Sequence, residues 1–377
     1  MALLSAFHLA TRTPQPCGLF PPDAYDALRT HVAGHPELKP TPLLKAKALA
    51  RSLGLKNLLL KDETARFGLP AFKGLGAGFA VAQLLARGSV ARGDLLVCAS
   101  EGNHGRAVAR VARAQGLRAR VYVGARVAVS RADAIALEGA EVVRVAGTYD
   151  DAVRQAAADA AAQGGHVVSD TAWEGYEEIP RLIMLGYTRL MDEAATQWKE
   201  KAPDVVVVQG GVGGLAAAVA SWYAANPAVP RARLLCVEPY HAACVMESAR
   251  AGRAVAIPGA LDTIMGGLRC GVVSPAALPA VLEGFDAYLA IDDTWTRRAM
   301  LRLARPAEGE RPVASGASGA AGLAALMALH ADSALGAVRE ALGISERTRA
   351  MVIVTEGVTE PELYEEIVGG GGRARLR

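Results

Sequence analysis

The chain has 377 residues, a length that favours two lobes over one small core. Its hydrophobic content of 51% and charged content of 21% exclude a largely disordered protein. The net charge of +3 gives no electrostatic reason to expect binding to nucleic acid or to a membrane.

The N-terminal residues lack the charged and apolar blocks of a signal peptide, and no apolar run reaches membrane-spanning length. The five cysteines are unevenly spaced and form no CxxC pair, which argues against a zinc site. We therefore expect a cytoplasmic protein without a metal.

Short β-branched runs alternate with longer alanine-rich segments along the chain. Buried strands are expected over 95–99, 120–123, 141–145, 166–168, 204–208, 234–237 and 351–355. Helices are expected from about His104, from Arg131 with Ser130 as its cap, over 149–163, and from about Leu215. This alternation predicts an α/β fold with two doubly wound, mainly parallel sheets and helices on both faces.

The domain organisation follows from where these units lie. Residues 86–172 contain a compact βαβ unit, and the chain on either side supplies the other strands. We expect a small inserted domain of residues 86–172 and a discontinuous large domain of residues 1–85 plus 173–377.

Lys73 stands directly before a glycine-rich helix start, in Pro70-Ala-Phe72-Lys73-Gly-Leu-Gly. The positive end of the helix dipole should discourage the charge of this lysine. A lysine held near neutral can bond covalently to an aldehyde cofactor. Most lysines are solvated surface residues, so the motif alone leaves both interpretations open.

Polar residues follow the strand over 95–99, in Ser100-Glu101-Gly-Asn103-His-Gly-Arg. This is the crevice where doubly wound proteins bind ligands. Asn103 could hydrogen-bond a ring hydroxyl, and Glu101 could act as an acid or a base. An ordinary capped turn would have the same composition.

A glycine-rich segment, Gln209-Gly210-Gly211-Val212-Gly213-Gly214, joins a strand to a helix. Glycine permits close backbone approach, and exposed N–H groups at a helix start bind phosphate. The segment is neither a Walker loop nor a GxGxxG motif. It favours a phosphate-binding loop over a plain turn.

Two further strand ends carry polar residues. Asp170 follows the strand over 166–168, and a carboxylate near a substrate Cα could move its proton. Thr355 ends the last strand and could hydrogen-bond a ring nitrogen, although a routine strand end would look the same.

Together these segments resemble the fold-type II pyridoxal-phosphate (PLP) enzymes, the family of threonine dehydratase, threonine synthase and the tryptophan synthase β-subunit. More closely, they resemble the diaminopropionate ammonia-lyases, over about residues 39–368. The closer resemblance is carried by 71–76, 101–106, 170–176, 179–180 with 186–187, 237–239, 263–268 with 270–271, and 315–319.

The resemblance implies a role for each of these positions. Lys73, with Phe72 beside it, would hold pyridoxal 5′-phosphate, and 210–214 would bind its phosphate. Asn103 would contact the ring O3′ and Thr355 the pyridine nitrogen. The substrate would be a small amino acid, 2,3-diaminopropionate, cleaved by α,β-elimination to pyruvate and two ammonia, and the enzyme would be a homodimer.

The two isomers of that substrate would be served by different acids. Asp170 matches the acid that serves the L-isomer, whereas Glu101 stands where the family usually has an aspartate for the D-isomer. A displacement of about 1 Å can cost on the order of a hundredfold in rate. We therefore expect L-isomer turnover to exceed D-isomer turnover.

Cys244 and Cys270 fall where some relatives carry a cysteine pair. The resemblance implies that the two could lie close enough to cross-link, whereas a reducing cytoplasm favours free thiols.

Other functions remain open at this level. A serine or threonine dehydratase, or a β-replacement enzyme acting on an O-activated serine, would share Lys73 and PLP but expel water or an ester. A PLP protein that has acquired a different substrate would also fit Glu101. A non-enzymatic nucleotide-binding protein could use 209–214 for phosphate, but Lys73 and Asp170 would then have no role.

Overall fold

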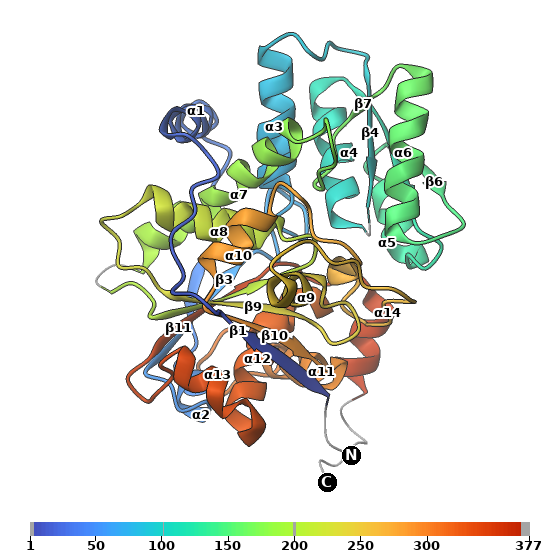
Figure 1. The fold of residues 1–377 in the computed structure, drawn as a ribbon. Coiled ribbons are helices and arrows are strands. Elements are labelled where there is room, and N and C mark those ends of the chain that lie inside the picture. The colour runs from blue at the N-terminus through green and yellow to red at the C-terminus, as the bar shows by residue number, and fades with distance from the viewer. Residues whose placement is uncertain (1–3, 101, 199–200, 371–377) are drawn as a thin grey trace.

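The computed structural model describes residues 4–100, 102–198 and 201–370. Its strands form two sheets (Figure 1). The large sheet has the order β1-β10-β9-β8-β11-β3-β2. These strands are β1 Ser5–Leu9, β2 Leu43–Lys45, β3 Asn57–Asp62, β8 Val205–Gln209, β9 Arg233–Pro239, β10 Ala287–Ile291 and β11 Arg349–Val354. Only the edge strands β1 and β2 pair antiparallel.

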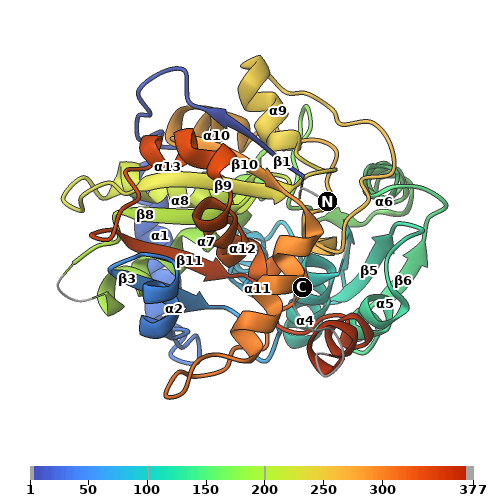
Figure 2. The same ribbon diagram turned by 90° about the horizontal axis from the view of Figure 1, so that it is seen from below.

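The small sheet has the order β6-β5-β4-β7 and is entirely parallel. Its strands are β4 Leu95–Ala99, β5 Arg118–Val123, β6 Glu141–Arg144 and β7 His166–Val167. The helices that follow them are α4 Asn103–Gln115, α5 Val129–Ala136 and α6 Tyr149–Gln163. Figures 1 and 2 show this group of elements beside the large sheet.

Helices cover both faces of the large sheet, with α7, α8 and α10 above it and α11, α12 and α13 below it in Figure 1. Their bounds are α7 Glu178–Gln197, α8 Gly214–Ala225, α10 Leu278–Gly284, α11 Asp293–Ala304, α12 Ala317–Ala331 and α13 Gly336–Ala341. The remaining helices are α1 Pro22–Ala33, α2 Lys47–Ser52, α3 Gly74–Ala86, α9 Cys244–Ala251, α14 Pro361–Tyr364, the 3₁₀ turns η1 Gly266–Leu268 and η2 Ser333–Leu335, and the π turn η3 Glu365–Gly369.

The fold class predicted from the sequence is confirmed, and each expected strand is present to within two residues at either end. Strands β1, β2, β3 and β10 were not anticipated. The prediction that Ser130 caps a helix is wrong, because α5 already begins at Val129, after Ala128, and has no side-chain cap. The strands of the small sheet all come from 95–167, which is compatible with the domain division at 86 and 172 that we continue to propose.

The helices offer one feature relevant to membranes. Among the described residues no single helix is long and apolar enough to cross a bilayer. The pair Ala317–Ala331 and Ser333–Ala341 would pass on length and composition, but it is bent by 99°.

Candidate active site

A pocket lies where the carboxyl ends of strands from both sheets meet. This is the edge at which doubly wound sheets bind ligands. Most of the residues singled out from the sequence line it: Phe72, Lys73, Asn103, Asp170, Gly210, Gly211, Val212, Gly214 and Thr355. Gly213 belongs to the same loop but not to the lining, and Glu101 lies outside the described residues.

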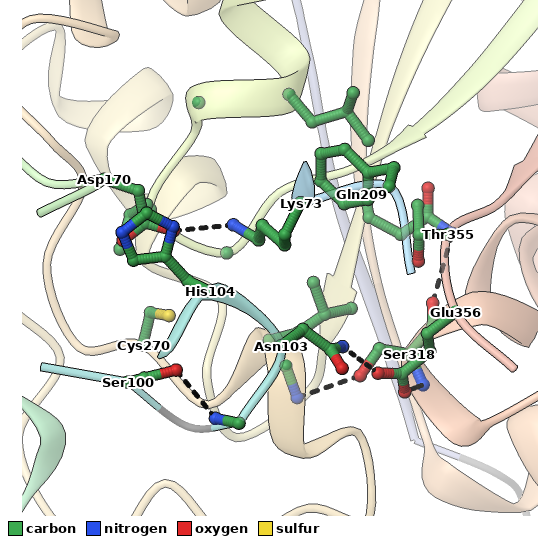
Figure 3. A pocket seen from close by; sticks show the side chains of 18 of the residues that line it. Lys73, Ser100, Asn103, His104, Asp170, Gln209, Cys270, Ser318, Thr355 and Glu356 are labelled. Carbon is green, nitrogen blue, oxygen red and sulfur yellow. Dashed lines mark hydrogen bonds and ion pairs between the residues drawn. The ribbon is translucent and has the colours of Figure 1, made fainter. Parts of the chain in front are cut away.

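Lys73 precedes α3 and points across the pocket at Asp170, with its Nζ 2.6 Å from Oδ2 of that carboxylate (Figure 3). The same Nζ lies 5.2 Å from the ring centre of Phe72 and 5.4 Å from that of Tyr187. Burial favours the neutral amine, but the charge of Asp170 and its hydrogen bond prevail and raise the pKa of Lys73. In the protein without cofactor, Asp170 therefore outweighs the influences that discourage the charge of Lys73.

Asp170 follows β7 and is 7% exposed. Its Oδ1 accepts a hydrogen bond of 3.2 Å from the hydroxyl of Tyr149, the first residue of α6. Burial would raise the pKa of Asp170, but the Lys73 ammonium and these hydrogen bonds hold it well below the ordinary value. The site thus contains an ionised carboxylate paired with an ammonium.

His104 lies beside this pair in the first turn of α4. Its Nε2 lies 2.7 Å from the carbonyl oxygen of Val168 and donates to it, because a carbonyl can only accept. Its Nδ1 is 3.9 Å from Oδ2 of Asp170 and makes no hydrogen bond to the described residues. Burial lowers the pKa of this imidazole, so it is neutral and carries a free lone pair.

The glycine loop 210–214 leads from β8 into α8. Gly211 has φ +62° and Gly213 has φ +88°, a left-handed backbone that favours glycine. No side chain among the described residues caps the start of α8, so its first N–H groups remain available for an anion.

The side chain of Glu238 packs against Gly210 of this loop and is 1% exposed. A Cβ at Gly210 would lie 2.6 Å from its Cγ, so only glycine fits above it. Its carboxylate accepts hydrogen bonds of 2.9 and 2.7 Å from the backbone N–H groups of Val245 and Met246. Burial raises the pKa of Glu238 to about 8 despite these bonds.

Asn103 and Thr355 lie on the side of the pocket away from Asp170. The amide nitrogen of Asn103 donates to Oε2 of Glu356, the residue after Thr355 (Figure 3). Thr355 is 5% exposed, and its carbonyl oxygen accepts a hydrogen bond of 3.3 Å from the N–H of Phe72. Contacts of Asn103 and Thr355 with a cofactor ring remain a prediction.

Cys244 and Cys270 are both buried in this structure. Both lie against the glycine loop. The thiol of Cys244 is 3.3 Å from the carbonyl oxygen of Gly211, and a Cβ on Gly211 would lie 3.9 Å from Sγ of Cys270. That the two could lie close enough to cross-link remains a prediction.

The chemistry of the donor set fits pyridoxal phosphate. The pocket combines a partly buried amine, an uncapped helix start that follows two left-handed glycines, and a hydroxyl at the end of β11. These features match an aldehyde, a phosphate and a pyridine nitrogen respectively.

The sequence interpretation gave no role to Tyr149, His104, Glu356 or Ser318, which also line the pocket. Tyr149 follows β6 after a short turn, and Glu356 is the second residue after the end of β11. Since the carboxyl ends of parallel strands share one edge of a sheet, this rule points to both residues. Ser318 and His104 lie in the first turns of α12 and α4.

Comparison with known proteins agrees with this donor set. The family model described as pyridoxal-phosphate dependent enzyme matches residues 35–344. Diaminopropionate ammonia-lyase of Escherichia coli strain K12 is 35% identical over 360 residues, which cover 91% of this chain and 90% of that protein. The Salmonella typhimurium enzyme of the same name is 35% identical over 90% of each chain.

Solved structures give the same answer. The Escherichia coli enzyme in complex with an aminoacrylate-PLP azomethine reaction intermediate has a TM-score of 0.91 and 33% identity, over 99% of both chains. Its complex with D-serine has a TM-score of 0.90 and 32% identity over the same shares. This chain therefore belongs to the pyridoxal-phosphate-dependent enzymes, and within them to the diaminopropionate ammonia-lyase family, with pyridoxal phosphate as its cofactor.

Proposed function

We propose that this enzyme converts 2,3-diaminopropionate and water into pyruvate and two ammonia by α,β-elimination. The observation that carries the proposal is the pairing of Lys73 with Asp170 in a pocket that also contains the glycine loop. The family membership of the chain supports the same reaction.

Each residue of the pocket has a task in this proposal. Lys73 holds the cofactor through its amine, and the N–H groups of the loop 210–214 bind the phosphate. Asn103 and Thr355 orient the ring. Bound pyridoxal phosphate supplies the electron sink that stabilises the carbanion formed at Cα.

Asp170 moves the Cα proton of the L-isomer. While Lys73 is charged, the pKa of Asp170 is too low for an effective base. Without the charge of Lys73, burial is the largest remaining influence, and burial raises the pKa of Asp170. Loss of the Lys73 charge therefore makes Asp170 a stronger base.

We also propose that the L-isomer is the better substrate, because Glu101 extends one methylene beyond the aspartate typical of the family at the D-isomer position. Asp170→Asn should lower kcat for the L-isomer about a hundredfold or more while the cofactor stays bound. Glu101→Asp should raise kcat/KM for the D-isomer. An exposed carboxylate of α5 provides a control, Asp133→Asn, which should leave both rates within about twofold.

Equal losses for both isomers in Asp170→Asn would contradict the division of labour between the two acids. Unchanged L-isomer turnover in that variant would contradict the role of Asp170 itself.

The assembly and location of the enzyme complete the proposal. We propose a homodimer in the cytoplasm, supported by the family resemblance. Light scattering on the eluting holoenzyme should give twice the chain mass, and a monomer mass would contradict the homodimer.

A further inference from the structure

Glu356 occupies a junction that the proposed reaction does not yet use. It is 1% exposed and follows Thr355 at the end of β11. Its Oε2 accepts from the amide of Asn103, and its Oε1 accepts a hydrogen bond of 3.1 Å from the N–H of Ser318. Arg131 lies 3.5 Å from the same Oε1. The carboxylate of Glu356 thus connects the first turn of α12 with Asn103 of α4 and Arg131 of α5.

Glycines make room for Glu356. A Cβ at Gly316 would lie 2.9 Å from Oε1 of Glu356, and one at Gly319 would lie 2.4 Å from its carbonyl oxygen. The N–H of Gly267 donates to Oγ of Ser318 at 2.9 Å, which fixes the serine beneath the carboxylate. The packing therefore gives a reason for the glycines at 316 and 319, which the proposed reaction leaves unexplained.

Arg131 connects the small sheet's helix α5 with the loop that follows β11 of the large sheet. It projects from α5 and is 4% exposed. Its guanidinium donates to Glu360 at 2.7 Å and to Thr359 at 2.9 Å, in addition to facing Glu356. Burial with several partners makes this arginine a rigid link between the small sheet and the loop after β11.

The chemistry of the carboxylate decides how Asn103 is oriented. An ionised carboxylate only accepts hydrogen bonds, whereas an amide both donates and accepts. Glu356 therefore binds the nitrogen end of the Asn103 amide and excludes the flipped orientation. A glutamine at 356 could bond either end of that amide, so both orientations would become accessible.

We propose that Glu356 is a positioning residue, which fixes the Asn103 amide against the cofactor ring and is itself held in place by Arg131 from the small sheet. The inference rests on the ring contact of Asn103 in the proposed function. It makes ring orientation depend on the docking of α5 against the loop after β11.

The test compares Glu356→Gln, Asn103→Ala and the double variant in the holoenzyme. In each, the pH titration of the bound cofactor's absorbance and the affinity of the apoprotein for pyridoxal phosphate are measured without substrate. Glu356→Gln should shift the titration midpoint and weaken cofactor binding about tenfold, and should lower kcat far more than it raises KM. In the Asn103→Ala background the same substitution should have little further effect, because both act through one contact.

Two further variants sharpen the result. Arg131→Lys keeps a charge but loses the forked guanidinium, and should give a partial shift of the same sign. Glu141→Gln removes an exposed carboxylate of the small sheet, 2.7 Å from Arg120, and should leave the cofactor spectrum unchanged.

Additive effects of Glu356→Gln and Asn103→Ala, or a wild-type spectrum and affinity in Glu356→Gln, would overturn the inference. Its failure is separable from failure of the proposed function, because the spectrum and affinity need no substrate. A wild-type enzyme that does not release ammonia from 2,3-diaminopropionate would refute the function and leave these two measurements interpretable.

Discussion

The Nζ atom of Lys73 lies 2.6 Å from Oδ2 of Asp170, although the two residues are 97 positions apart in the chain. One stands before α3, and the other follows β7 of the small sheet. The pair therefore joins the proposed cofactor-holding amine to the proposed base. Its charges are mutually stabilising in a largely buried place, which makes the energetics of the apoprotein a direct test of the geometry.

Removing the lysine alone should destabilise the apoprotein. Lys73→Met leaves Asp170 buried without its cation and should lower the free energy of unfolding by about 2–3 kcal/mol. The loss is at the lower end for a buried pair because the Lys73 side chain remains 21% exposed. Adding Asp170→Asn should recover a large part of the loss. Denaturant unfolding of the apoproteins measures both.

The control is Arg154→Met, which removes a surface cation that pairs with Asp151. The Arg154 side chain is 71% exposed. The substitution should change stability by less than about 1 kcal/mol. A Lys73→Met loss as small as that of the control would contradict the buried pairing.

Cofactor affinity should depend on the backbone of the glycine loop. Gly213→Ala places a Cβ at φ +88°, 3.1 Å from Cγ2 of Val273 and 3.2 Å from Cβ of Ala277. The left-handed conformation alone costs roughly 1–2 kcal/mol for an L-residue, so the loop should be displaced and pyridoxal phosphate should bind about tenfold more weakly. Titration of the apoprotein with the cofactor measures this.

The matched substitution is Gly252→Ala after α9, which has φ +66° and open space around its Cβ position. It carries the same kind of backbone strain away from the pocket and should leave cofactor affinity unchanged. Equal losses in both variants would mean that general destabilisation, not the loop, weakens binding.

Glu238 should give the protein a characteristic dependence of stability on pH. Its pKa of about 8 in the folded protein exceeds the ordinary value of 4.5, so between these values the folded protein holds a proton that the unfolded chain has lost. The free energy of unfolding should therefore fall as pH rises from about 4.5 to 8.

Glu238→Gln removes this titration. Thermal unfolding of the apoproteins between pH 5.5 and 8 should show a steeper decline of Tm for the wild type than for the variant. Parallel curves would contradict the raised pKa of Glu238.

Much of the fold was predictable because β-branched runs mark buried parallel strands. The expected strand 95–99 and helix 149–163 coincide with β4 and α6. Strand β3 escaped notice because it contains Lys61, whose buried Nζ bonds Glu193 of α7 at 2.8 Å. A charged residue with so distant a partner interrupts the apolar pattern that identifies a strand. In β10 two alanines weaken the strand signal in the same way.

The site was predictable as a set of residues but not as a set of contacts. Lys73, Asp170, Asn103 and the glycine loop do line one pocket, since strand ends converge at one edge of a sheet. The charge of Lys73 was misjudged because a helix dipole is visible in the local sequence, whereas the stronger partner, Asp170, is not. The bond from Asn103 to Glu356 joins residues 253 positions apart and leaves no local signal.

The most direct test of the account is the ratio of ammonia to pyruvate released by the holoenzyme from L-2,3-diaminopropionate, with L-serine, L-threonine and the Lys73→Ala variant alongside. We predict two ammonia per pyruvate from the diamino acid, with the fastest turnover among these substrates, and no turnover in the variant. Turnover confined to the hydroxy amino acids, with one ammonia per keto acid, would contradict it and make the enzyme a dehydratase.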